Sequence, residues 1–428
     1  MINIAAVKLW GENIGTVMKP DDSDYTLFEY DKTFLKSGIE LSPVTMPLSD
    51  RVYSFPELDI NSFHGLPGLL SDSIPDKWGN AIIEAWQTKQ GRSLSELTAI
   101  DRLCYTGKRG MGALEYEPVI GIKSDIDQEV NVSAMVELAS KILSERENAV
   151  VQSDSVSMEQ IMQVGTSAGG ARAKAIIAWN PESGEIRSGQ LDAGEGFDYW
   201  IMKFDGIVNN GDKEGADKPE YCLREYAYYL MATDAGINMS ESKLYEENER
   251  SHFMTRRFDR NPITHEKIHM QSLAAIAHYD FNNPGANSYE QAAYIMRRMG
   301  LGQNEIKQLY RRMVFNILAR NNDDHVKNIS FLMSKDGVWR LSPAYDITYA
   351  YNPNRKWTGM HQMSMNGKRD AFTDNDFEEC ARNMDIKIRD AKNILNEVKL
   401  SVSRWEEFAH CAHLSEKQTK YIKNNLLV

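Results

Sequence analysis

Asp323, Asn328 and Asp346 are the residues of this 428-residue sequence whose types and spacing best fit a chemical role. Asp323 and Asn328 stand five positions apart in the segment NNDDHVKN, and Asp346 follows in SPAYDIT. Phosphoryl transfer needs a carboxylate that orients the attacking hydroxyl and takes its proton, and it needs hard oxygen ligands for Mg²⁺. We therefore predict that Asp323 is catalytic and that Asn328 and Asp346 bind Mg²⁺, as in the catalytic loops of kinases.

Taken alone, this spacing also fits a solvated loop with Asp346 as a turn residue, so the parts upstream matter. Lys203 lies in the apolar segment YWIMKF, where a lysine is costly unless it is paired, and Glu225 on the next predicted helix offers a partner. Gly169 and Gly170, in GTSAGGARAK, can bring backbone N–H groups close to phosphate oxygens. This loop lacks the GK[ST] ending of a Walker motif, and it would be weak evidence by itself.

The elements that must position these residues change in kind along the chain. Short strands are predicted up to about residue 55, with a turn at Gly-Glu-Asn (11–13), and a helix over DKWGNAIIEAWQTKQG. Alternating strands and helices are predicted over 156–258, with one hairpin over AKAIIAWN–EIRSGQL and a second over SKLYEENERSHFMTRRFD that turns near Asn248–Arg250. From about residue 270 the pattern is mostly helical, interrupted by a β-hairpin over ISFLMSKDGVWRLSP. This order of parts predicts an α+β, protein-kinase-like fold with a mixed α/β N-terminal half and a mostly helical C-terminal half. A ligand cleft is expected between the two halves.

The segment from His265 to His269 matches the HExxH pattern of zinc proteases. Such a site needs both histidines one turn apart on a helix together with a third ligand. Pro262 precedes the pattern and the predicted helix starts only near Ser272, so we expect no zinc site. Glu290 could still serve as a distant third ligand, which leaves the alternative open.

Composition limits the class of protein. The formal net charge of −12 argues against a free-standing nucleic-acid binder but leaves room for a DNA-binding partner. No apolar stretch is long enough for a membrane span, and the N-terminus is too polar for a signal peptide. Four cysteines lie far apart without a CxxC pair. We expect a cytoplasmic, reduced protein with no membrane partner.

The combined motifs resemble the HipA toxins, the serine/threonine-protein kinases of bacterial type II toxin–antitoxin modules. LLSDSIPDKWGNAI and GKRGMGALEYEP resemble the N-terminal subdomain of that family. TSAGGARAK, IMKFDG, RRFDR, NDDHVKN and SPAYDIT resemble its kinase core, in that order. The resemblance implies a two-lobed HipA fold with an N-terminal subdomain over 1–120, a kinase N-lobe over 121–258 and a helical C-lobe over 259–428.

Carried over position by position, the resemblance implies the roles given above for Asp323, Asn328 and Asp346, and it adds a set of nucleotide contacts. These are Ala168, Gly169, Gly170, Ala171, Arg172, Ala173 and Lys174 in the phosphate loop, Lys203 with Glu225, Arg256, Arg257 and Phe258 in the hinge, and His325 and Lys327. Ser167 matches the serine that these kinases autophosphorylate, and a phosphate there would repel the phosphates of ATP. Asp324 and Arg256 depart from the family pattern, and Asp324 adds a negative charge beside the metal site.

The implied cofactors are ATP and Mg²⁺. The implied partner is a small helix-turn-helix antitoxin, HipB-like, through which the chain would meet DNA only indirectly. The implied substrate is a protein of the translation machinery, such as an aminoacyl-tRNA synthetase. Two alternatives remain: a catalytically inactive kinase-fold co-repressor that acts with a DNA-binding antitoxin, and a small-molecule kinase.

Overall fold

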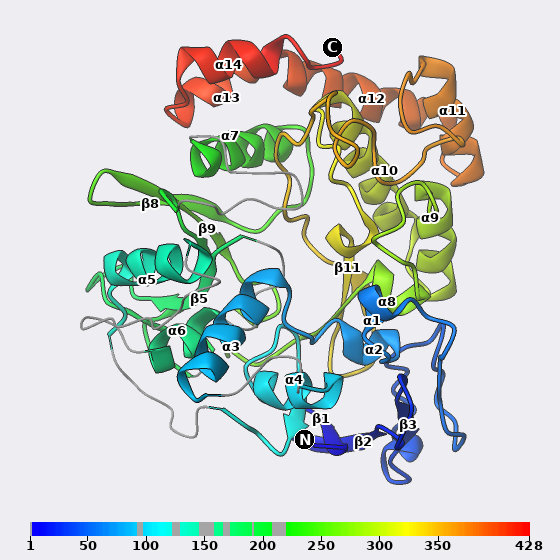
Figure 1. Cartoon of the computed structure of the whole chain (residues 1–428). Helices are drawn as coiled ribbons and strands as arrows, with labels where there is room; N and C mark the ends of the chain where they lie inside the picture. The colour runs from blue at the N-terminus through cyan, green and yellow to red at the C-terminus, as the bar shows by residue number, and fades with distance from the viewer. Residues whose placement is uncertain are drawn as a thin grey trace. The chain divides into compact units, whose positions relative to one another are not determined.

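The computed structural model describes residues 2–91, 97–121, 129–144, 158–165, 172–190, 192–207 and 220–428. The chain groups into two compact units, and Figure 1 labels most of their helices and strands. The first unit comprises residues 1–41, 48–222 and 243–270, and the second comprises residues 42–47, 223–242 and 271–428. In the described part of the chain, no helix has the length and apolar character needed to span a membrane.

The first unit begins with an antiparallel sheet in the order β3-β2-β1-β4. Its strands are β1 (Ile4–Leu9), β2 (Glu12–Met18), β3 (Leu27–Tyr30) and β4 (Leu114–Glu117). The turn between β1 and β2 falls on Trp10 and Gly11, which both have positive φ, rather than on the predicted Gly-Glu-Asn. Positive φ at both central positions gives the tight hairpin whose twist matches its strands.

A second sheet of the first unit has the order β6-β5-β7-β9-β8. Its strands are β5 (Lys174–Trp179), β6 (Ile186–Ser188), β7 (Asp198–Lys203), β8 (Ser242–Glu247) and β9 (Arg250–Arg256). The predicted hairpins over AKAIIAWN–EIRSGQL and SKLYEENERSHFMTRRFD correspond to β5–β6 and β8–β9. The positive φ angles of Asn248 and Glu249 place the second turn where the sequence predicts it.

The first unit also contains helices, and some of them pack their apolar side chains on one face of this second sheet. The helices are α1 (Ile60–Phe63), α2 (Gly68–Ser71), α3 (Lys77–Lys89), α4 (Ala99–Thr106), α5 (Val132–Ser144) and α6 (Met158–Gly165). One core joins α3, α5 and α6 to the side chains of Ala175, Ile177, Trp200 and Met202. Side chains alternate between the two faces along a strand. Lys174, next to Ala175 on β5, and Lys203, next to Met202 on β7, therefore lie on the face away from these helices.

The second unit is mostly helical, as predicted. Its helices are α7 (Tyr221–Asp234, except the first two residues), α8 (Leu273–Ala277), α9 (Tyr289–Arg298), α10 (Gln303–Leu318), α11 (Asp374–Asn383), α12 (Ile388–Ser403), α13 (Trp405–Cys411) and α14 (Glu416–Lys423). The predicted hairpin is β11 (Ser330–Met333) with β12 (Trp339–Leu341), and β10 (His269–Ser272) joins them in a three-stranded sheet. The hairpin carries the chain from Asn328 to Asp346.

Candidate active site

Asp323 and Asn328 lie in the loop that follows α10. The helix ends because Arg320 adopts a positive φ and Asn321 N–H bonds back to the carbonyl of Asn316 at 2.9 Å. A single turn of 3-10 helix, Val326–Asn328, then closes the loop. Within it the Nδ2 of Asn328 donates to the main-chain carbonyl of Asp323 at 2.9 Å. The predicted catalytic carboxylate and the predicted metal-binding amide therefore belong to one compact, hydrogen-bonded loop.

Two further side chains approach the carboxylate of Asp323. The indole Nε1–H of Trp357 donates to Asp323 Oδ1 at 2.7 Å. The Nε2 of His325 lies 3.9 Å from the same oxygen, and its ring packs 6.0 Å from that of Phe281, centroid to centroid. The Nζ of Lys327 sits 4.5 Å from the ring centroid of Phe281. His325 and Lys327 thus line the same loop as Asp323, as the resemblance implies.

Asp324 faces away from its neighbour and into the core. Its carboxylate is 1% exposed, whereas that of Asp323 is 32% exposed. It accepts the hydroxyl of Tyr289 at 2.7 Å, the Nδ1 of His361 at 3.0 Å and the main-chain N–H of Gln362 at 2.7 Å. Although burial by itself would raise the pKa of Asp324, His361 and these hydrogen bonds hold that pKa below its ordinary value. Asp324 is therefore an internal anchor of the loop.

Asp346 lies beyond β12 with a positive φ of 52°. The hydroxyl of the preceding residue, Tyr345, donates to the carbonyl of Lys327 at 2.6 Å. Because Tyr345 and Lys327 are the immediate neighbours of Asp346 and Asn328, this bond fixes the two predicted metal-binding segments to each other. The side chains of Asn328 and Asp346 both supply oxygen atoms, which suit a hard cation such as Mg²⁺.

Beneath the loop is a small cavity of about 20 Å³ lined by Tyr289, Leu309, Arg312, Asn316, Asn321, Asp324, His325, Asn328, Ile329, Ala344, Tyr345 and Ile347. Arg312 is buried, and burial lowers its pKa to about 10. Its Nη2 donates to the carbonyl of Ser342, while Nε and Nη1 have no hydrogen-bond partner in the part of the chain that the structure describes. Among the described residues, the Oδ1 of Asn321 and the Nδ1 of His325 also lack partners. Three residues that line this cavity thus carry buried polar atoms without a partner there.

In the first unit, Lys174 and Lys203 are direct partners in the register of β5 and β7. Both side chains are buried. The Nζ of Lys203 also lies 5.9 Å from the ring centroid of Phe253. Glu225 is buried on α7 in the second unit, and its pairing with Lys203 stays a prediction.

The phosphate loop is described only at its end. Ser167, Ala168, Gly169, Gly170 and Ala171 lie outside the described residues. Arg172 stacks its guanidinium 3.0 Å from the ring centroid of Tyr221, and Ala173 is buried and accepts the N–H of Phe204 at 3.3 Å. The carbonyl of Lys174 accepts the indole N–H of Trp78 at 2.9 Å, which fixes the start of β5 against α3.

The hinge residues use their side chains within the first unit. Arg256 pairs with Asp198, and Arg257 makes a buried bidentate pair with Asp259 at 2.9 and 2.7 Å. The main-chain N–H of Arg257 donates to the carbonyl of Tyr199 at 2.8 Å. Phe258 is half-buried. The guanidinium of Arg257 is thus fully engaged, and the contact of Arg257 with a nucleotide stays a prediction.

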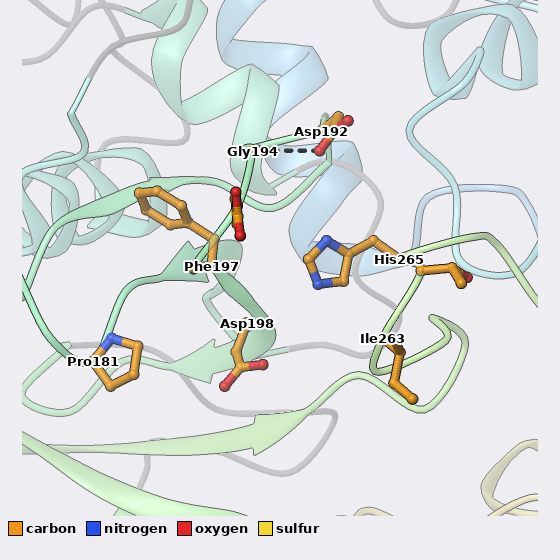
Figure 2. A pocket seen from close by; sticks show the side chains of 10 residues that line it. Pro181, Asp192, Gly194, Phe197, Asp198, Ile263 and His265 are labelled. Carbon is orange, nitrogen blue, oxygen red and sulfur yellow. Dashed lines mark hydrogen bonds between the residues drawn. The ribbon is translucent and has the colours of Figure 1, made fainter.

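The HExxH segment does not form a metal site. His265 lies in a turn with a positive φ, and His269 begins the strand β10, so the two histidines do not share a helix. Figure 2 shows His265 lining an open pocket of about 480 Å³ together with Asp192, Phe197 and Asp198. Within the described ranges no three His, Cys, Asp or Glu side chains gather as metal ligands would.

Two models of known protein domains match the chain. A model of the HipA N-terminal domain matches residues 5–117, and a model of the HipA-like C-terminal domain matches residues 166–405. The chain belongs to the HipA family.

A solved structure of a HipA protein shares the fold of this chain. HipA of Shewanella oneidensis MR-1, from a toxin–antitoxin complex with HipB and operator DNA, matches with a TM-score of 0.67 and 15% identity over 98% of this chain and 94% of that chain. A protein of Haemophilus influenzae named "Putative kinase" is 26% identical over 161 residues, or 34% of this chain. That match spans about half (47%) of the relative's length. The kinase-like HipA fold predicted from the sequence is confirmed.

Trp357 and Arg312 were not among the sequence-derived candidates, although each leaves a trace in the sequence. Trp357 is a large aromatic residue inside the polar stretch NPNRKWTG. Arg312 falls on the apolar stripe of α10, next to Met313 and three residues after Leu309. A charged residue on a buried stripe and an aromatic residue in a polar loop both need an explanation.

Proposed function

We propose that this HipA-family chain is an ATP- and Mg²⁺-dependent serine/threonine protein kinase that acts as the toxin of a toxin–antitoxin pair in the cytoplasm. The observation that carries the proposal is the loop in which Asn328 bonds to Asp323 and Tyr345 ties this loop to Asp346. A partly exposed carboxylate beside two oxygen ligands for a hard cation is the arrangement that phosphoryl transfer to a hydroxyl requires.

In this proposal each group has one task. Mg²⁺ would neutralise charge on the phosphate oxygens of ATP. Asp323 orients the substrate hydroxyl and takes its proton as the oxygen attacks the γ-phosphorus and ADP leaves. Asn328 and Asp346 hold the cation. Lys203, which is buried at the end of β7, orients the phosphates with Glu225 as its partner.

The proposed partner is a HipB-like antitoxin that binds DNA, so that this acidic chain meets DNA only through it. The complex of the Shewanella relative with HipB and operator DNA supports this assignment. The proposed substrate is a protein of the translation machinery, such as an aminoacyl-tRNA synthetase. We further propose that the kinase phosphorylates its own Ser167 and thereby limits its activity, because a phosphate beside the nucleotide site repels ATP.

The test is phosphate gain measured by intact mass and peptide mapping, on protein first treated with a phosphatase that is then removed. Wild type incubated with Mg-ATP should gain one phosphate at Ser167. The variant Asp323→Asn should gain almost none and keep only a slow residual transfer, whereas Asp336→Asn, at an exposed turn of the β11–β12 hairpin, should behave as wild type.

Full transfer by Asp323→Asn would overturn the catalytic assignment. ATP binding without transfer to any protein would favour the inactive co-repressor, and transfer only to a small molecule would favour the small-molecule kinase. Copurification with the DNA-binding antitoxin tests the proposed partner in the same preparation.

A further inference from the structure

A strap formed by residues 350–362 runs along the catalytic loop within the second unit. The N–H of Ala350 donates to the carbonyl of Arg320 at 3.0 Å. The Nδ2 of Asn322 donates to the carbonyl of Thr358 at 3.1 Å. The N–H of Gln362 donates to Asp324 Oδ1 at 2.7 Å. The strap is thus attached to the loop on both sides of Asp323.

Trp357 lies near the middle of this strap and contacts Asp323 directly. Its indole Nε1–H donates to Asp323 Oδ1 at 2.7 Å, and its own carbonyl accepts the Nε2 of Gln362. The strap therefore holds the indole through its backbone and presents one N–H to the carboxylate. The main chain of Asp323 is held as well, because the Nδ2 of Asn328 donates to its carbonyl at 2.9 Å.

A hydrogen bond from a neutral N–H to a carboxylate is charge-assisted, and it belongs to the stronger class of hydrogen bonds in proteins. It fixes the rotation of the carboxylate, which otherwise turns about two side-chain bonds. A carboxylate offers about four lone-pair sites, so one indole N–H leaves capacity for a substrate hydroxyl. The bonds at both ends of the strap argue for a fixed support rather than a lid that must leave before reaction.

We propose that Trp357 is a positioning residue: its indole N–H sets the orientation of the Asp323 carboxylate towards the hydroxyl of the substrate. This inference rests on the proposed function, because it assigns to Asp323 the role of the base. In this role Trp357 acts by orienting Asp323. Its removal should therefore slow the chemical step and leave the binding of ATP unchanged.

The first experiment compares Trp357→Phe with Trp405→Phe, which is the matched control. Phenylalanine keeps an aromatic ring and removes the N–H. Trp405 lies in the same unit, where its indole donates to the carbonyl of Thr419 at 3.0 Å, away from Asp323. We expect Trp357→Phe to lower kcat about tenfold, which corresponds to the lower end of a hydrogen bond to a charged group. KM for ATP should stay within about twofold, and Trp405→Phe should retain wild-type kcat.

A double-mutant cycle shows whether Trp357 acts through Asp323. In the Asp323→Asn background the further change Trp357→Phe should have little effect on residual transfer. An equal loss in both backgrounds, or an unchanged kcat in Trp357→Phe, would show that Trp357 is merely structural and would overturn the inference.

The hydrogen bond between Trp357 and Asp323 can be observed by NMR, without an activity assay. The chain has eight tryptophans, so ¹⁵N-labelled protein gives few indole resonances, and Trp357→Phe identifies the one that matters. The indole N–H resonance of Trp357 should shift upfield in Asp323→Ala, because the acceptor is gone. The indole N–H resonance of Trp405 should keep its position. An unshifted resonance overturns the inference. Wild-type transfer by Asp323→Asn instead refutes the proposed function, and the two failures are thereby distinguished.

Discussion

The main-chain N–H of Gly112 donates a 2.7 Å hydrogen bond to Oδ2 of Asp259, which lies 147 residues further along the chain. The same carboxylate accepts Arg257 in a bidentate pair and Arg260 at 3.1 Å. Gly112 has a φ of +74°, and a Cβ there would lie 3.0 Å from the main-chain nitrogen of Met270. The segments GKRGMG and RRFDR therefore meet at one buried carboxylate, and this contact has room only for glycine.

Asp259→Asn should destabilise the first unit strongly. Although burial by itself would raise the pKa of Asp259, Arg257, Arg260 and the N–H of Gly112 hold that pKa below its ordinary range. Removing the charge leaves two buried guanidinium groups without their anion, which costs about 3–5 kcal/mol of unfolding free energy. Asp198→Asn, in the half-exposed pair with Arg256, should cost about 0–1 kcal/mol. Urea unfolding measures both, and equal losses would contradict the prediction.

Substitutions at the neighbours Asp323 and Asp324 should have different effects, one on activity and the other on stability. Asp324→Asn replaces one acceptor oxygen of a buried network with a donor, so it should lower the unfolding free energy by about 1–3 kcal/mol. Asp323→Asn changes a partly exposed residue and should leave stability nearly intact while transfer is lost. Thermal unfolding followed beside the transfer assay checks this contrast. A stable Asp324→Asn protein would remove the anchor role assigned to Asp324.

The cavity under the catalytic loop should hold one ordered water. Its volume of about 20 Å³ exceeds the roughly 10–15 Å³ that one water needs. Arg312 can donate to that water, Asn321 Oδ1 can accept from it, and His325 Nδ1 completes its partners. A high-resolution crystal structure would show the water, and an empty cavity would contradict the prediction.

Arg312→Met keeps the length of the side chain but removes the donors to the water and to Ser342. It should lower stability by about 1–3 kcal/mol. Arg311→Met is the matched control on the same helix, because Arg311 bonds to Ala235 and Glu397 instead. If Arg312→Met and Arg311→Met were both as stable as the wild type, the prediction would be contradicted. The buried N–H groups of Arg312 would then need no hydrogen-bond partner.

Stability should fall as the solution becomes acidic, partly because of His269. Burial lowers the pKa of His269 to about 3 from an ordinary value of 6.5. Between those two values the unfolded chain binds one proton more than the folded chain. The unfolding free energy therefore drops by about 1.4 kcal/mol per pH unit from this residue as the pH falls from 6.5 towards 3. Urea unfolding over this pH range should give a flatter slope for His269→Leu, and parallel slopes would refute the assignment.

The sequence by itself determined the helices, the hairpins and the ordered motifs. Periodicity and turn residues are local properties, so α3, α10 and the β11–β12 hairpin could be placed from neighbouring residues alone. The spacing of Asp323, Asn328 and Asp346 was equally visible, because one short loop and one hairpin carry all three. The order of these parts was sufficient to predict a protein-kinase-like fold, and the resemblance of the motifs to the HipA toxins implied the HipA fold.

Only the tertiary structure decided which way the polar side chains face. Asp323 and Asp324 are identical residues in adjacent positions, yet the first is partly exposed and the second is an internal anchor. Trp357 reaches Asp323 across 34 residues, and the register of β5 and β7 sets Lys174 beside Lys203. These contacts join segments that are distant in the chain, so they depend on how strands register and loops cross. Local sequence preferences do not contain that information, because a shift of one residue in a strand turns every side chain to the other face.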